Sequence, residues 1–401
     1  MGVESKTQGF ACELTLMNKI HSAWRVIQEF CLNLQFRLGR CVLRTWNESN
    51  SRYMKLYSFC LLCLVVLLGC QKLDQETTNT EENSPQYEEL DALALVTQSV
   101  INMREEPDFT AELGTQALMG TPVKLHHEGV NGYWNYVETP DGYKAWCNEL
   151  AVRKIDAQEL REWKHSKRVI VTAFYTFFLE EPADESLHVG DGCWGCIVQY
   201  LGEEGDFTKV LMPSGKTAYV PTKDVADFDQ WVTGRKAVVL ADASEAALEV
   251  ARKEILNTAL KFIGIPYLWG GTSIKGVDCS GLVKTVYYLN GYLLLRNCSQ
   301  IYKTGIPIDV SHGLENLQPA DLVFFGEEAT EEKPLSVSHM AIYMGDGKII
   351  QSSNIVRVNS LVEGEKDYFS SKPLCAVRII GSQDTGCGVE SIAASDVYYE
   401  K

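Results

Sequence analysis

The alternation of apolar and polar positions divides this chain into a strand-rich part and a later part that begins with helices. From about residue 92 to residue 230, short alternating runs are separated by turns that contain glycine and proline, which predicts small antiparallel sheets. From residue 242, apolar residues recur at helical spacing in two successive segments, and after residue 320 the pattern returns to strands. The last domain is therefore predicted to be α+β, with its helices ahead of an antiparallel sheet.

The second of these helices is predicted to begin with a cysteine. A glycine-rich loop leads into Asp278, Cys279 and Ser280, and apolar residues at helical spacing then continue to a stop at Gly291. A cysteine in the first turn of a helix lies among unpaired backbone N–H groups at the positive end of the helix dipole, which favours the thiolate. Cys279 is therefore a candidate nucleophile, although cysteine statistics alone favour a small buried thiol at a helix start.

A histidine and a glutamine are predicted to lie on neighbouring strands of a hairpin. His339 begins a strand that leads into the turn at residues 345–347, and Gln351 lies on the returning strand. The two side chains are then opposite or diagonal on one face of the sheet. The amide oxygen of Gln351 can accept a hydrogen bond from one imidazole nitrogen and leave the other free, so that Gln351 orients a catalytic base. A histidine considered alone is more often structural, and the neighbouring motifs favour catalysis here.

Composition and charge narrow the possible functions. The chain has 401 residues, enough for two or three domains, and its net charge of −16 argues against nucleic acid as a partner. Its 13 cysteines form no regular framework. Cys193 and Cys196 have CxxC spacing without a second such pair, so we interpret them as structural and leave a local disulfide open. No metal-ligand cluster or phosphate-binding loop is visible, and we expect a monomer without a cofactor.

The stretch from Met54 to Cys70 has the order of a secretory signal, with a charged start, an apolar run and a small residue before the processing point. The run is too short to span a bilayer comfortably, and its end resembles the lipobox of bacterial lipoproteins, which implies acylation of Cys70. We expect an exported protein, lipid-anchored to a bacterial membrane at the periplasmic or cell surface, with a buried helix or an uncleaved anchor as the alternative. The acidic, polar residues that follow predict a flexible tether. Residues 1–53 carry no recognisable motif, and we interpret them as an artefact of start-site choice.

The strand-rich part resembles two bacterial SH3-like domains in tandem. In the first, Trp134 and the Asp-Gly-Tyr turn at residues 141–143 follow the pattern of that domain. In the second, the stretch from Gly215 to Tyr219 resembles this turn in sequence. Each domain is predicted to be a small all-β barrel. The predicted segments are residues 1–53 (unassigned), 54–70 (signal peptide), 71–91 (tether), 92–155 and 167–230 (SH3-like domains), 242–381 (catalytic domain) and 382–401 (a loosely ordered tail).

Three motifs of the last domain resemble the NlpC family, whose members are papain-like cysteine peptidases that cut bacterial cell-wall peptides. The motifs are Tyr267-x-Trp269-Gly270-Gly271 with Asp278-Cys279-Ser280-Gly281, then Ala320-Asp321-Leu-Val-Phe-Phe325, and then His339-Met-Ala-Ile-Tyr-Met-Gly-Asp-Gly347. The resemblance implies a papain-like α+β domain in which Cys279 is the nucleophile, His339 the general base and Gln351 the orienting residue.

With the SH3-like domains upstream, the chain resembles the γ-D-glutamyl-L-diamino acid endopeptidases of that family. This resemblance implies hydrolysis of the γ-D-glutamyl–diamino acid bond of murein stem peptides, in recycling or remodelling. The substrate-binding residues that it implies are Tyr267, Trp269, Asp278, Ser280, Asn297, Tyr143 and Glu112. Asn297 and Gln351 depart from the family pattern, which has an acid that helps to bind the substrate amine at the first position and often a second histidine at the other. Two alternatives stay open: a papain-like amidase or acyltransferase on another amide, and a non-catalytic murein-binding lipoprotein.

Overall fold

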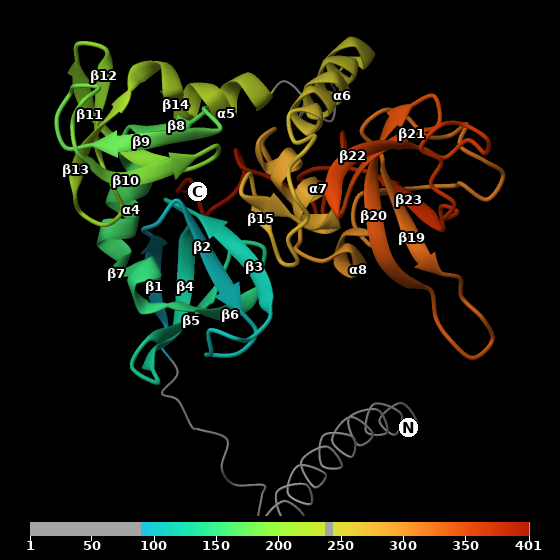
Figure 1. Ribbon diagram of the computed structural model, residues 1–401, viewed down its shortest axis with the longest axis horizontal. Helices are drawn as coiled ribbons and strands as arrows, with labels where there is room; N and C mark the ends of the chain where they lie inside the picture. Colours follow the sequence, from blue (N-terminus) through green and yellow to red (C-terminus); the bar gives the residue numbers. More distant parts are fainter. Residues whose placement is uncertain (1–89, 237–243, 401) are drawn as a thin grey trace, which may run out of the picture. The chain divides into compact units, whose positions relative to one another are not determined.

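The computed structural model describes residues 90–236 and 244–400 (Figure 1). These residues all belong to one compact unit, Tyr87–Lys401. The expected signal peptide, its Cys70, the unassigned residues 1–53 and all but the end of the expected tether lie outside the described residues. Within the two described ranges, no helix combines the length and the apolar content that crossing a membrane requires.

The first upstream module is a seven-stranded antiparallel sheet with the strand order β3-β2-β6-β5-β4-β1-β7. Alternating residues of its strands, such as Val137, Ala145 and Cys147, are buried and form its core, because successive side chains of a strand point to opposite faces. Among the described strands no pairing joins the two ends of this order, so the predicted closed barrel is not shown. The strands are β1 (Ala92–Val96), β2 (Val100–Arg104), β3 (Leu113–Leu118), β4 (Pro122–Val130), β5 (Trp134–Glu138), β6 (Lys144–Asn148) and β7 (Val152–Ile155).

The second upstream module has the same topology as the first. Its strand order, β10-β9-β13-β12-β11-β8-β14, becomes that of the first module when each number is lowered by seven. A 3-10 turn precedes the last strand in both modules, as η1 (Glu149–Ala151) and η2 (Thr222–Asp224). Here too, no pairing among the described strands joins the two ends of the order. The strands are β8 (Arg168–Val171), β9 (Tyr175–Leu179), β10 (His188–Cys193), β11 (Ile197–Glu204), β12 (Phe207–Leu211), β13 (Thr217–Pro221) and β14 (Val225–Asp227).

A helix follows each module. The first, α4 (Ala157–His165), begins at the N-cap Asp156, whose carboxylate accepts a backbone hydrogen bond as capping residues do. The second, α5 (Phe228–Lys236), follows β14 directly. Trp163 of α4 and Trp231 of α5 are buried in the same hydrophobic cluster. The two modules therefore share a core at their helical ends.

The last domain has helices ahead of an antiparallel sheet, as predicted. Helix α6 (Glu245–Leu260) begins at the N-cap Ser244, and α7 (Cys279–Tyr288) begins at the N-cap Asp278. The six-stranded sheet has the order β18-β23-β19-β20-β21-β22. Its strands are β18 (Ile306–Ile308), β19 (Leu322–Glu327), β20 (Ser336–Gly345), β21 (Lys348–Ser353), β22 (Ile355–Ser360) and β23 (Cys375–Arg378). The short elements around it are β15 (Thr272–Ser273), β16 (Gly276–Val277), β17 (Tyr292–Leu293), α8 (Cys298–Ile301) and β24 (Glu390–Ser391).

Helix α7 is held against this sheet by its apolar face. Leu282, Val283 and Val286 are fully buried and belong to the same core cluster as residues of β19, β20 and β21. Burying a side chain of this size contributes roughly 1.5–3 kcal/mol. The apolar face thus fixes the first residue of α7, Cys279, next to the strands that carry His339 and Gln351.

The C-terminal segment is packed, and the expectation of a loosely ordered tail is wrong. Its strand β24 pairs with β17, and Ile392 and Tyr398 are buried. The carbonyl oxygen of Tyr398 accepts a hydrogen bond of 3.0 Å from Arg168 of the second module. The segment shows no apolar periodicity from which this packing could be predicted. Its buried side chains instead contact distant parts of the chain.

Candidate active site

Asp278 starts α7 and holds the loop before it. Its carboxylate accepts hydrogen bonds from the backbone N–H of Gly281 at 2.6 Å and of Gly270 at 3.0 Å, so it caps the helix and fastens the glycine-rich loop to the helix start. Gly270 has a φ of +77°, and a Cβ at this position would lie 2.2 Å from the carbonyl oxygen of Leu113. Only glycine fits there. The thiol of Cys279, next after the cap, is half-buried.

His339 lies beside an irregularity in the sheet. In the pairing of β19 with β20, Phe325 lies opposite His339 and Gly326 lies opposite Val337, so Ser338 is the extra residue of a β-bulge. Bulges bend a strand and change the direction of neighbouring side chains, and they are frequent next to active sites. The bulge is absent from the sequence pattern that predicted the hairpin.

The structure brings Cys279, His339 and Gln351 together. Nε2 of His339 is hydrogen-bonded to Oε1 of Gln351, and the Cys279 thiol lies close enough to the imidazole for each group to shift the pKa of the other. Because Gln351 occupies Nε2, Nδ1 is the nitrogen left for the thiol. Gln351 is fully buried, so water does not compete for its amide. This geometry can remove the thiol proton and later return it to a leaving group.

A second thiol changes the electrostatics of the nucleophile. Contact with the Cys298 thiol and burial raise the pKa of Cys279, and the hydrogen bond with His339 opposes them. The same contact between the thiols lowers the pKa of Cys298 to about 7. Burial lowers the pKa of His339, but its contacts with Cys279 and Gln351 outweigh burial and bring that pKa above its usual value. The pKa values of the two thiols therefore lie on opposite sides of the ordinary thiol value.

Cys298 was missed at the level of the sequence. It is the first residue of the short helix α8, after the N-cap Asn297, and its Sγ also lies 3.7 Å from the carbonyl oxygen of Val337 on β20. No spacing rule links positions 279 and 298. The nearest signal was the departure of Asn297 from the family pattern, and it concerned that residue alone.

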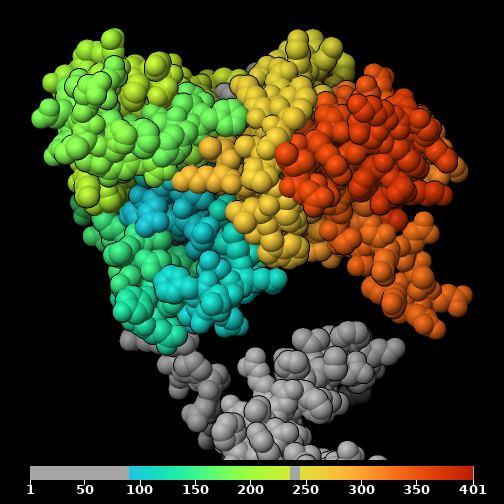
Figure 2. Space-filling model, viewed as in Figure 1, coloured from blue at the N-terminus to red at the C-terminus, as the bar shows by residue number. Residues whose placement is uncertain are grey.

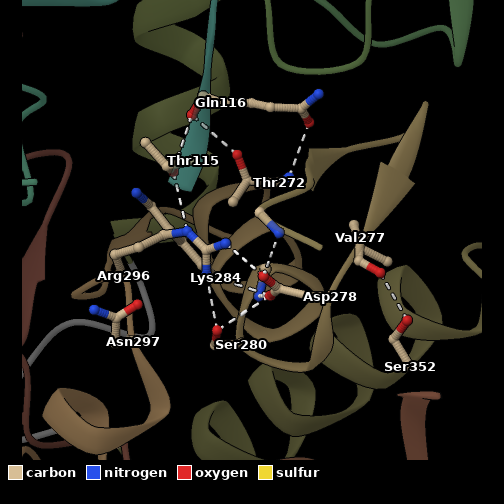
Figure 3. Close-up of polar contacts among 12 residues, drawn as sticks. Thr115, Gln116, Thr272, Val277, Asp278, Ser280, Lys284, Arg296, Asn297 and Ser352 are labelled. Atoms are coloured by element: carbon tan, nitrogen blue, oxygen red, sulfur yellow. Dashed lines mark hydrogen bonds and ion pairs between the residues drawn. The ribbon is translucent and has the colours of Figure 1, made fainter. Parts of the chain in front are cut away.

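A buried arginine organises the start of α7 (Figure 3). Arg296 is 2% exposed, and its guanidinium donates to the Asp278 carboxylate at 2.5 Å and to the Ser280 hydroxyl at 2.8 Å. Its Nε donates to the Thr115 hydroxyl of the first module at 3.0 Å. Asp278 and Ser280, predicted to bind substrate, are thus occupied in this network, and Arg296 is a site residue that sequence reasoning did not single out.

Two predicted aromatic residues lie on the loop before the nucleophile. Trp269 is 60% exposed, and Tyr267 is half-buried. Burial and the neighbouring Cys279 sulfur raise the pKa of Tyr267 to about 12. The Tyr267 hydroxyl is therefore a hydrogen-bond donor at neutral pH, close to the nucleophile.

Tyr143 of the first module lies beside a glutamate other than the predicted one. Its hydroxyl donates to Oε1 of Glu105 at 2.5 Å, and Arg296 lies near enough to influence its pKa, which burial and Glu105 raise. A Cβ on Gly114 would lie 2.2 Å from that Glu105 oxygen. Glu112 is exposed, and its backbone carbonyl accepts from the N–H of Glu105. The carboxylate that meets Tyr143 is therefore Glu105.

The first module supports the loop of the catalytic domain through one amide. Oε1 of Gln116 accepts from the backbone N–H of Thr272 and from the Ser273 hydroxyl, each at 3.0 Å. Gln116 and both partners are buried. In Figure 2 the loop region before α7 (gold) lies directly against the first module (blue to cyan). One wall of the site is thus built by a separate module.

A thiol at a helix start, an imidazole from a neighbouring sheet and an amide that orients it define a papain-like cysteine hydrolase. Residues 264–378 match the NlpC/P60 family, and residues 99–151 match the bacterial SH3 domain. The chain belongs to the NlpC/P60 family, and it is a peptidase of cysteine type.

Relatives and solved structures agree with this assignment. The chain is 34% identical over 275 residues to the gamma-D-glutamyl-L-lysine dipeptidyl-peptidase of Bacillus subtilis, covering 66% of this chain and 80% of that protein. It is 29% identical over 284 residues to dipeptidyl-peptidase 6 of Lysinibacillus sphaericus, covering 69% of this chain and 94% of that protein. The crystal structure of an NlpC/P60 family protein from Bacillus cereus has the same fold, with a TM-score of 0.55 and 23% identity, over 72% of this chain and all of that one.

Proposed function

We propose that this protein cleaves the γ-D-glutamyl–diamino acid bond of murein stem peptides. The observation that carries the proposal is the contact of Cys279 with His339, which Gln351 holds in place. The names of relatives that cover most of this chain's folded part support the choice of bond. The match of residues 99–151 to a bacterial SH3 domain agrees with a cell-wall substrate.

The proposed reaction is acyl transfer through a thioester. Nδ1 of His339 takes the proton of the Cys279 thiol, and the sulfur attacks the γ-glutamyl carbonyl carbon. Backbone N–H groups at the start of α7 stabilise the oxyanion. The tetrahedral intermediate collapses as the imidazolium gives its proton to the leaving amine of the diamino acid. Water, deprotonated by the same imidazole, then releases the acyl group and restores the thiol.

The first module is proposed to select a peptide with a free amino terminus. The Glu105 carboxylate, hydrogen-bonded to Tyr143, supplies a negative charge near the loop that carries Trp269. Asn297, where the family pattern has an acid, is the N-cap of α8 and supplies no charge. Recognition of the substrate amine therefore depends on Glu105, and this assignment replaces the sequence-based choice of Glu112.

Several finer expectations become part of the proposal. The matching strand orders of the two modules support a tandem pair of SH3-like domains, of which the second has diverged further. We also propose that the protein acts as a monomer, exported and anchored to a bacterial membrane through a lipid on Cys70, and that murein stem peptides are its partners there.

The test is a cleavage assay with defined peptides. A protein that begins at residue 71 is incubated with L-Ala-γ-D-Glu-diaminopimelate, and the free diamino acid is measured. Release is expected with the wild type and not with Cys279→Ala. Binding of the peptide without turnover by the wild type would instead support a non-catalytic murein-binding protein, and turnover of other amides only would support a different amidase.

A matched pair of peptides tests the role of Glu105. Acetylation of the substrate amino terminus removes its charge, so the wild type is expected to cleave the acetylated peptide at least about tenfold less efficiently, which corresponds to one charge-assisted hydrogen bond. Glu105→Gln should remove most of this preference, and Glu112→Gln should leave it intact. Equal cleavage of both peptides by the wild type would contradict amine recognition.

A further inference from the structure

A row of polar side chains continues from His339 into the sheet. His339 lies on β20, Gln351 on β21 and Asn359 on β22, which are neighbouring strands. Nε2 of Gln351 donates to Oδ1 of Asn359 at 3.0 Å, and Nδ2 of Asn359 donates to the carbonyl oxygen of Asp367 at 2.8 Å. Gln351 is 0% exposed and Asn359 is 6% exposed. The row therefore lies out of reach of bulk water.

The last member of the row determines the direction of every hydrogen bond before it. A backbone carbonyl can only accept, so Asp367 requires the NH₂ group of Asn359, and the oxygen of Asn359 must face Gln351. That oxygen in turn requires the NH₂ group of Gln351, and the oxygen of Gln351 must face His339. A glutamine oxygen accepts only, so Nε2 of His339 carries the proton. Nδ1 is then unprotonated and free to accept the proton of the Cys279 thiol.

The loop that supplies this carbonyl also covers the imidazole. Asp367 has a φ of +59°, an uncommon conformation for a residue other than glycine, and its carbonyl accepts a second hydrogen bond from the Ser360 N–H at 3.2 Å. Phe369 follows, and its ring centroid lies 5.8 Å from that of His339. The Phe325 ring centroid lies 5.9 Å from that of His339 and 5.0 Å from that of Phe369, so the two phenyl rings lie next to each other beside the imidazole. The loop after β22 thus fixes both the hydrogen-bond row and the ring.

We propose that Asn359 is a positioning residue for His339. Its hydrogen bond to the Asp367 carbonyl fixes the orientation of its own amide and, through it, that of the Gln351 amide. The oxygen of Gln351 then keeps His339 in the Nε2–H tautomer. Without Asn359, the buried amide of Gln351 can rotate and present its NH₂ group to Nε2 of His339. The imidazole would then be protonated at Nδ1 and unable to accept the thiol proton. The proposal rests on the proposed role of His339 as the base, but the tautomer is measurable without any substrate.

The direct test is ¹⁵N NMR of protein labelled at histidine. The chain has 7 histidines, and the signals of His339 are assigned by their loss in His339→Ala. In the wild type, at a pH where the ring is neutral, we expect the Nε2–H form. In Asn359→Leu we expect a mixture with the Nδ1–H form. An Nδ1–H ring in the wild type would overturn the proposal without reference to any other variant or to activity.

Kinetics provide a second readout. A wrong tautomer lowers kcat by up to about 10⁴-fold in a related arrangement, and a partial population of it in Asn359→Leu is expected to lower kcat roughly tenfold or more. KM should change little, because Asn359 is buried behind Gln351 and is remote from the exposed loop residues. An unchanged kcat in folded Asn359→Leu would overturn the proposal.

Two comparisons separate positioning from a loss of stability. Asn290 is another buried asparagine of this domain, with side-chain hydrogen bonds to Thr258 and Val286, so Asn290→Leu is the matched control and should keep the wild-type tautomer. In a Gln351→Glu background both carboxylate oxygens are acceptors, so the additional change Asn359→Leu should alter kcat less than about twofold. An equal loss from Asn359→Leu in both backgrounds would contradict transmission through Gln351.

Discussion

The residue with the greatest unexpected influence on the nucleophile is Cys298. The influence of the two thiols on each other raises the pKa of Cys279 and lowers that of Cys298 to about 7. The neighbouring Cys298 thiol therefore favours the protonated form of the attacking sulfur. A hydroxyl in its place could only donate to the Cys279 thiolate.

We predict that Cys298→Ser shifts the acid limb of the kcat/KM profile to lower pH. The substitution removes the thiol contact that raises the pKa of Cys279, and a hydroxyl stabilises the thiolate by donating a hydrogen bond. The measurement is the pH dependence of kcat/KM between about pH 5 and pH 9, together with the rate of alkylation of Cys279. Cys375→Ser is the control, since burial alone raises the pKa of that distant thiol. An unmoved acid limb would contradict this influence of Cys298 on the pKa of Cys279.

The buried ion pair of Arg296 and Asp278 gives a prediction about stability. Arg296→Met leaves the Asp278 carboxylate buried without its cation, and the loss expected from breaking a buried pair is about 3–5 kcal/mol in the free energy of unfolding. The double change Arg296→Met with Asp278→Leu should recover most of this loss, apart from about 1 kcal/mol for the missing helix cap. Urea unfolding measures both.

The matched control is an exposed ion pair. Lys154 and Glu128 lie 3.0 Å apart with both side chains about half exposed, and Lys154→Met should cost less than about 1 kcal/mol. A loss of that small size for Arg296→Met as well would show that the guanidinium is not required to hold the start of α7.

At the scale of elements, the active site depends on where strands and helices end. The N-terminus of α7, the bulge in β20 and the loop after β22 each contribute one constraint on the Cys279–His339 contact. The C-terminal segment with β24 contributes none directly. It instead joins β17 of the catalytic domain to Arg168 and the buried aromatic cluster of the upstream modules.

We predict that removal of residues 390–401 destabilises the whole folded unit. The deletion exposes the partners of Ile392 and Tyr398, which are buried, and burial of each such side chain contributes about 2 kcal/mol. A fall of roughly 4 kcal/mol or more in the free energy of unfolding is expected in urea. Tyr399→Phe is the control, because it removes only an exposed hydroxyl that donates to Asp229, and it should change stability by less than about 0.5 kcal/mol.

At the scale of the whole molecule, the peptidase site is shared between the catalytic domain and the first module. Thr115, Gln116 and the pair of Glu105 and Tyr143 all come from the first module, and they reach Arg296, the glycine-rich loop and the proposed amine site. A module that matches a bacterial SH3 domain thus acts here as a wall of the site. The proposed amine site and the catalytic residues are therefore connected through one interface.

We predict that Gln116→Leu raises KM more than it lowers kcat. The substitution leaves the Thr272 N–H and the Ser273 hydroxyl buried without their shared acceptor, at a cost of about 1–3 kcal/mol for each group. The loop that carries Tyr267 and Trp269 then loses its support, whereas the row of His339, Gln351 and Asn359 is untouched. Steady-state kinetics with the free peptide measure the split, and Gln158→Leu, at an exposed position of α4, serves as the control. A pure loss of kcat would contradict this division of roles.

The sequence by itself determined the features that depend on neighbours within one element or one hairpin. The capping residue Asp278, the apolar face of α7 and the short turn between His339 and Gln351 are local patterns, and helix periodicity and strand alternation predict them directly. For the same reason, the order of helices and sheet in the last domain was predictable. The motif resemblance added the roles of these residues.

Only the tertiary structure decided which distant side chains complete the site. Cys298 beside Cys279, Glu105 rather than Glu112 beside Tyr143, and the packed C-terminal segment all depend on contacts between residues far apart in the chain. Such contacts are selected by packing, burial and hydrogen-bond satisfaction in three dimensions, and they leave no periodic signal along the chain. The strand order of the upstream sheets is a property of the same kind, because strand pairing is set by the fold and not by the alternation within each strand.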